Sequence, residues 1–123
     1  MQLLIQSDNG SGNGHRMRCQ AIAEAWLEAG GTVDSPDVAE GAWVILDGYS
    51  FTEDDQRAIV KSGSKLLVID DNAHLARYHA DILLNYSAYA KQLKYKVEKS
   101  TKLLLGPEYF PLRREFREYA LYR

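Results

Sequence analysis

A histidine follows a glycine-rich run near the start of the chain. The run, Gly10-Ser11-Gly12-Asn13-Gly14, comes after the apolar stretch Leu3-Leu4-Ile5 and leads through His15 into a helix-like segment from Cys19 to Ala29. The first N–H groups of a helix lack internal partners and attract anions, and glycines let a ligand approach the backbone closely. The same helix end disfavours a charged imidazolium, so a neutral His15 could act as a general base. The stretch predicts a ligand site with a base, although a tight connection with a surface or capping histidine fits the same pattern.

This run does not match the common nucleotide-binding motifs. A dinucleotide fingerprint that begins at Gly10 and Gly12 needs a third glycine where the chain has His15. The Lys-Ser/Thr pair of a P-loop is also missing. We therefore expect neither a nicotinamide cofactor nor any other cofactor.

Further polar residues follow apolar runs later in the chain. Asp47 with Tyr49, Asp70 with Asp71, and Asn85 each come at the end of a run typical of a buried strand. Because ligands of parallel sheets bind outside the carboxyl ends of the strands, we expect these residues to gather there with His15 and with the segment 106–109. Aspartate commonly ends strands, so hydrogen bonding is favoured over metal binding, and no metal site is expected.

Apolar periodicity predicts alternating strands and helices. Strands are expected over 3–6, 42–46, 65–69, 82–85 and 102–105, with a very short one at 32–33; helices are expected over 19–29, from the N-cap Thr52 to about 62, and from Pro111 through 119. This order predicts an α/β fold, a single Rossmann-like domain over residues 1–123 with a mostly parallel sheet of about five strands.

Composition narrows the classes of partner. The chain has 123 residues, a net charge of −2 and one cysteine. The charge gives no basis for binding nucleic acid, and one cysteine permits no internal disulfide. Because no signal peptide or apolar run of membrane-spanning length is visible, a cytoplasmic protein without a membrane span is expected.

Several short motifs together resemble a known family. In order, they are Ser7-Asp8, Gly12-Asn13-Gly14-His15-Arg16-Met17-Arg18-Cys19, Leu46-Asp47-Gly48-Tyr49, Val68-Ile69-Asp70-Asp71, Ala80-Asp81-Ile82-Leu83-Leu84-Asn85 with Ala88-Tyr89, Leu105-Gly106-Pro107-Glu108-Tyr109 and Leu112-Arg113-Arg114-Glu115-Phe116. Their order and spacing along nearly the whole chain are similar to the N-terminal domain of the UDP-sugar hydrolases of pseudaminic acid biosynthesis. The glycosyltransferase-like proteins of spore-coat polysaccharide synthesis are related to these hydrolases.

The resemblance implies a fold, a reaction and a set of site residues. It implies the sugar-side half of a two-domain GT-B enzyme that hydrolyses a UDP-linked amino sugar. His15 would activate the water that attacks the anomeric carbon and displaces UDP with inversion, and Tyr49 would lie in the same site. The other residues implied to bind the nucleotide-sugar substrate are Gly12, Asn13, Gly14, Asp47, Asp71 and Asn85.

Three departures from the family qualify this expectation. Gly48 stands where the family commonly has histidine, and only residues 30–41 separate the first helix from the next long strand. The nucleotide-binding half is also expected to be absent, so the chain alone should be inactive or nearly so and could pair with a second half or with itself. Two alternatives are glycosyl transfer, with His15 activating an acceptor hydroxyl, and a non-catalytic binding or interaction domain.

Overall fold

The computed structural model describes residues 2–7, 13–33 and 42–110; the side chains of residues 7, 13–18 and 33 are outside this description. The elements are β1 (Gln2–Ser7), α1 (Asn13–Glu28), β2 (Thr32–Val33), β3 (Trp43–Asp47), α2 (Glu53–Lys61), β4 (Lys65–Ile69), β5 (Ile82–Asn85), the 3-10 turn η1 (Ala90–Gln92), β6 (Lys102–Leu105) and the 3-10 turn η2 (Pro107–Tyr109). The strands β4, β5 and β6 have the predicted bounds. The final helix expected from Pro111 lies outside the described residues.

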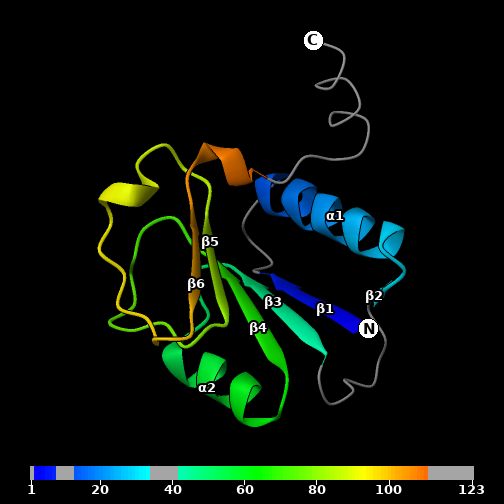
Figure 1. Cartoon of the computed structure of the whole chain (residues 1–123), viewed down its shortest axis with the longest axis horizontal. Helices are drawn as coiled ribbons and strands as arrows, with labels where there is room; N and C mark the ends of the chain where they lie inside the picture. Colours follow the sequence, from blue (N-terminus) through cyan, green and yellow to red (C-terminus); the bar gives the residue numbers. More distant parts are fainter. Residues whose placement is uncertain (1, 8–12, 34–41, 111–123) are drawn as a thin grey trace.

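All six strands form one parallel sheet in the order β2-β1-β3-β4-β5-β6. The α/β fold with a Rossmann-like parallel sheet is therefore confirmed. The very short strand expected at 32–33 is present as β2, which pairs with β1 and makes six strands where about five were expected. From β1 the chain moves outward in one direction to β2 and in the other to β3. Right-handed crossovers then place α1 and α2 on opposite faces of the sheet (Figure 1).

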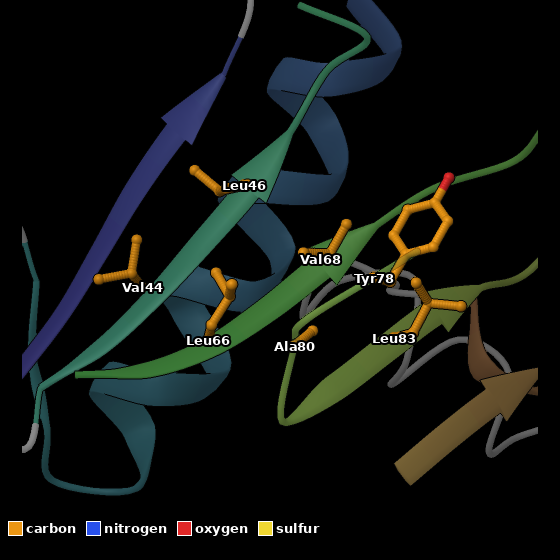
Figure 2. Close-up of a cluster of buried hydrophobic side chains, with 7 residues drawn as sticks. All are labelled: Val44, Leu46, Leu66, Val68, Tyr78, Ala80 and Leu83. Atoms are coloured by element: carbon orange, nitrogen blue, oxygen red, sulfur yellow. The ribbon is translucent and has the colours of Figure 1, made fainter. Parts of the chain in front are cut away.

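Each face of the sheet carries its own apolar core. On the α2 face, seven buried side chains pack together: Val44, Leu46, Leu66, Val68, Tyr78, Ala80 and Leu83 (Figure 2). On the α1 face, the buried cluster is Leu3, Ile45, Ile69 and Leu84, against which Ile22 and Trp26 of α1 pack. Neighbouring residues of β3 and β4 thus point to opposite faces and are buried on both, as expected for a parallel sheet between helices.

The helix ends explain where the connections begin. Thr52 caps α2: its hydroxyl accepts from the N–H of Asp55, whose carboxylate accepts from the N–H of Thr52. α1 ends before Gly30, which has a φ of +92° that favours glycine. α1 begins at Asn13, six residues before the expected start at Cys19, so the second half of the glycine-rich run is already helical.

Two irregular segments complete the α2 side. The connection from β4 to β5 contains Tyr78, which is fully buried and forms an isolated bridge with Val97 in the connection from β5 to β6. These connections pack on the sheet beside α2 and bring Tyr95 to the end of β4. In the described part of the chain, no helix is long and apolar enough to cross a membrane.

Candidate functional site

A pocket lies at the carboxyl edge of β3, β4 and β5. Its walls are Asp47, Gly48, Tyr49, Ile69, Asp70, Asp71, Asn85, Tyr86 and Ser87, and its cavity volume is about 80 Å³. This volume is below the roughly 300–1,000 Å³ of a complete small-ligand site. The sheet therefore gathers the ends of three strands, including four residues predicted for the site: Asp47, Tyr49, Asp71 and Asn85.

Tyr49 and Asp71 form the outer wall of this pocket. The Tyr49 hydroxyl donates to Asp71 Oδ1 at 2.7 Å, which links the turn after β3 to the end of β4. This hydrogen bond to a carboxylate, with partial burial and the charge of Asp70, raises the pKa of Tyr49 to about 12. Tyr49 therefore stays protonated at neutral pH and is a hydrogen-bond donor, not a base.

Gly48 allows the turn that exposes Tyr49. Its φ is +155°, a value that residues with side chains rarely adopt. A histidine at this position, as the family commonly has, would be strained on this backbone. The departure noted in the sequence is thus accommodated by a conformation suited to glycine.

Asp47 connects the pocket to α1. It is buried at the end of β3, and the Cys19 thiol donates to its Oδ2 at 3.4 Å. His15 lies four residues before Cys19, so the two share one face of the helix. The described backbone thus places His15 in the first turn of α1, one turn before Cys19. Cys19 packs in the interior.

Asp70 lies in the inner wall of the pocket and accepts several hydrogen bonds there. Its Oδ2 accepts from the N–H groups of Asn72 and Ala73 and from the Tyr95 hydroxyl, at 3.1, 2.8 and 2.6 Å. Its Oδ1 accepts from the Tyr78 hydroxyl at 3.1 Å. These bonds hold Ala73 at a φ of +52°, which is uncommon for a residue with a side chain. Asp70 therefore fixes the sharp turn after β4, the hydrogen-bonding role expected for one of the aspartates.

The same carboxylate fixes the tautomer of His74. Nδ1 of His74 lies 3.1 Å from Asp70 Oδ1 and 2.7 Å from Asn72 Oδ1. Asn72 Oδ1 also accepts from the backbone N–H of His74, so it is the amide oxygen and Nδ1 is the donor. The His74 ring packs edge-on against the Tyr49 ring, with 5.8 Å between the two ring centroids.

Asn85 is held between its neighbours. Its Nδ2 donates to the Tyr95 hydroxyl at 3.0 Å, and its Oδ1 accepts from the backbone N–H and hydroxyl of Ser87 at 3.0 and 2.7 Å. Because Tyr95 donates in turn to Asp70, the ends of β4 and β5 share one network. Asn85 is buried, so its contact with a ligand, predicted from the sequence, would use only its remaining hydrogen-bonding capacity.

The lining has a clear chemical character. Three aspartates, one asparagine and one serine line it beside two tyrosine rings, and none of the described lining residues is cationic. The carboxylate oxygens of Asp70 and the amide oxygen of Asn85 already accept hydrogen bonds within the fold. The described residues contain no group of three or more His, Cys, Asp or Glu side chains able to hold a metal. Such a pocket suits a ligand that donates hydrogen bonds and presents an apolar ring face.

Four predicted site residues lie at or before the start of α1. Asn13, Gly14 and His15 form its first turn, and their side chains are outside the described part; Gly12 lies outside it altogether. The structure therefore locates the backbone of His15 but leaves its role a prediction.

Comparison with known proteins gives a partial match. The chain is similar to the UDP-2,4-diacetamido-2,4,6-trideoxy-beta-L-altropyranose hydrolase of Campylobacter jejuni, with 36% identity over 80 residues. The match covers 63% of this chain and 28% of that enzyme's length. No family model matches the sequence. The match supports the resemblance to UDP-sugar hydrolases, while the N-terminal placement and the GT-B arrangement stay predictions.

Three residues of the site were not predicted. Tyr86 and Ser87 line the pocket, and Tyr95 ties Asn85 to Asp70. Tyr86 and Ser87 come immediately after a predicted strand, and this position could have marked them as residues of the carboxyl edge. No local signal marks the contact of Tyr95 with a residue 25 positions earlier.

Proposed function

We propose that this chain forms the sugar-binding side of an enzyme that hydrolyses a UDP-linked amino sugar. The observation that carries the proposal is the pocket at the carboxyl edge, whose described walls offer acceptor oxygens and tyrosine rings without a cation. Hydroxyl and acetamido N–H groups of a sugar are donors that such walls can bind. The similarity to the Campylobacter jejuni UDP-sugar hydrolase supports the same substrate class.

The proposed base is His15, in the first turn of α1. The positive end of the helix favours a neutral imidazole, which can accept a proton from water. The water oxygen bonds to the anomeric carbon as the bond from that carbon to the phosphate oxygen breaks. His15 takes the proton, and UDP leaves with the electron pair. Tyr49, a donor held by Asp71, orients the sugar or the water.

The diphosphate requires a different surface. Asp47, Asp70 and Asp71 in the pocket would repel a phosphate group. We propose that a second, nucleotide-binding domain of a GT-B arrangement supplies the surface that stabilises the departing charge. The proposed activity therefore requires both halves.

Ligand binding tests which part of the substrate this chain holds. Saturation-transfer NMR with UDP-N-acetylglucosamine should give stronger signals on the sugar and acetamido protons than on the uracil protons. A dissociation constant of about 1 mM or weaker is expected, since this chain would supply one wall of the proposed site. Asp71→Asn should weaken the signals, whereas Asp54→Asn, which removes an equal charge from α2, should leave them unchanged. Dominant uracil signals would contradict the proposal.

Activity can be tested in a chimera in which this chain replaces the matching part of the Campylobacter jejuni enzyme. With that enzyme's named substrate, the chimera should release UDP and a free reducing sugar. His15→Ala should lower kcat by about 10²–10⁴-fold, the usual contribution of a general base. His79→Ala, a histidine away from the pocket, should leave kcat unchanged, and circular dichroism checks that each variant folds. Release of UDP only when an acceptor sugar is added would instead indicate glycosyl transfer.

A further inference from the structure

The α1 face of the sheet is covered unevenly. α1 packs chiefly on β1 and β2, at one side of the sheet. On β4, β5 and β6 the same face carries Leu67, Leu104 and, just after β5, Tyr86, which are only partly buried. We call these three residues the apolar shelf. On this same face Ile69 and Leu84 are buried, so the shelf borders a covered part of the sheet. On the opposite face, Leu66 and Leu83 are fully buried, and Leu103 of β6 is 40% exposed.

The apolar shelf has room for one further helix. Strands lie about 4.8 Å apart, so β4 to β6 span about 10 Å. A helix with its side chains is about 10 Å across, so a single helix covers roughly two to three strands. α1 is the only described helix that packs on this face. A second helix would complete the layer.

The chain leaves β6 on the side of the shelf. After η2, Phe110 is the last described residue. Its ring packs edge-on against the Tyr86 ring, with 4.7 Å between the two ring centroids. Phe110 is 51% exposed, so its outer surface still faces solvent. The segment that follows therefore starts beside the shelf.

The sequence after Phe110 has the pattern of an amphipathic helix. Pro111 suits the first turn, and apolar residues recur at helical spacing; they are Leu112, Phe116, Tyr119 and Ala120. The intervening positions carry the charged residues Arg113, Arg114, Glu115, Arg117 and Glu118, and Leu121 falls on the charged side. As a helix, residues 111–121 would be about 16 Å long, enough to cross the shelf.

We propose that residues 111–121 form a helix that docks its apolar stripe on the shelf beside α1. The occupant is this segment because it begins where Phe110 already contacts Tyr86 and because its apolar residues match an apolar surface of the right width. Docking would hold Phe110 against Tyr86. Since Tyr86 also lines the pocket, the segment would steady one wall of the candidate site.

NMR on the full chain tests the contact directly. Nuclear Overhauser effects are expected between the Phe116 ring and the methyl groups of Leu67 or Leu104. A sample that mixes labelled and unlabelled chains separates contacts within one molecule from contacts with a second copy. Effects seen only between chains, effects to Leu66 or Leu83 on the opposite face, or no effects at all would each overturn the proposal.

Two neighbouring substitutions provide a second measurement. Phe116→Ser should lower the folding equilibrium constant about tenfold or more, the scale of one buried aromatic ring. Arg117→Ser, one position along on the charged side, should change it less than about twofold. Both constants are measured by urea denaturation. Equal effects of the two substitutions would also overturn the proposal.

Discussion

Tyr49 donates its hydroxyl proton to Asp71 across 2.7 Å and thereby joins the turn after β3 to the end of β4. The tyrosine ring is 54% exposed, so the bond holds in place a side chain that would otherwise rotate freely in solvent. A residue with this placement can meet a ligand with a fixed ring face and a fixed hydroxyl. The bond is thus the most accessible part of the candidate site and the easiest to measure.

The ionisation of Tyr49 should report this bond. Difference absorbance between the native chain and Tyr49→Phe should titrate with a midpoint near 12, because the Asp71 carboxylate raises the pKa of the phenol. Asp71→Asn should lower that midpoint toward 10, the ordinary value. Asp54→Asn, which removes the same charge from α2, should leave it in place. A midpoint near 10 in the native chain would mean that the bond does not form in solution.

The two adjacent aspartates should differ sharply in their effect on stability. Asp70→Asn replaces a buried carboxylate that accepts from Asn72, Ala73, Tyr78 and Tyr95, and places an amide donor among these donors. We expect the free energy of unfolding to fall by about 2–4 kcal/mol. Asp71→Asn should cost less than about 1 kcal/mol, since it weakens one hydrogen bond at an exposed site. Urea denaturation of both variants measures the difference, and similar losses would contradict the role given to Asp70.

Most of this fold could be predicted from local patterns. The apolar runs of β4, β5 and β6 each end at a polar or glycine residue, and their bounds match the structure. The carboxyl edge followed from the parallel order, and with it the grouping of Asp47, Asp71 and Asn85. These features depend on residues within one element or on a general rule of parallel sheets.

Two features could not be predicted, for different physical reasons. The early start of α1, at Asn13, was missed because glycine and polar residues favour turns in isolation. The bond from Tyr95 to Asp70 was missed because it joins residues 25 positions apart across an irregular connection. Such a contact depends on the folded path of the chain and leaves no periodic signal.

The buried tyrosines should make the protein less stable at high pH. Burial is the main cause that raises the pKa of Tyr78 and Tyr95 above the usual 10, and the Asp70 carboxylate adds to it. Their contribution to stability is full below pH 10. As the pH rises above 10, the unfolded chain loses these protons while the folded chain keeps them, so the free energy of unfolding falls. Each tyrosine should contribute a slope of up to about 1.4 kcal/mol per pH unit.

Urea denaturation between pH 8 and pH 11 measures this slope. Tyr95→Phe should make the slope shallower, because it removes one tyrosine whose pKa is higher in the folded chain than in the unfolded chain. Tyr109→Phe is the control, because it removes an exposed tyrosine of η2 instead of a buried one. It should leave the slope close to that of the native chain. An identical slope in Tyr95→Phe and the native chain would rule out the proposed linkage.

The contact between Cys19 and Asp47 should govern both thiol reactivity and the position of α1. Cys19 is buried and donates to a buried carboxylate, so a thiol reagent should modify it only when the chain opens. The rate of modification should therefore rise with urea concentration in step with unfolding. Cys19→Ala removes the donor to Asp47 and should lower the free energy of unfolding by about 1–2 kcal/mol, whereas Cys19→Ser keeps a donor and should cost less. Modification of the folded chain at the rate of a free cysteine would show that α1 is not held on the end of β3 in this way.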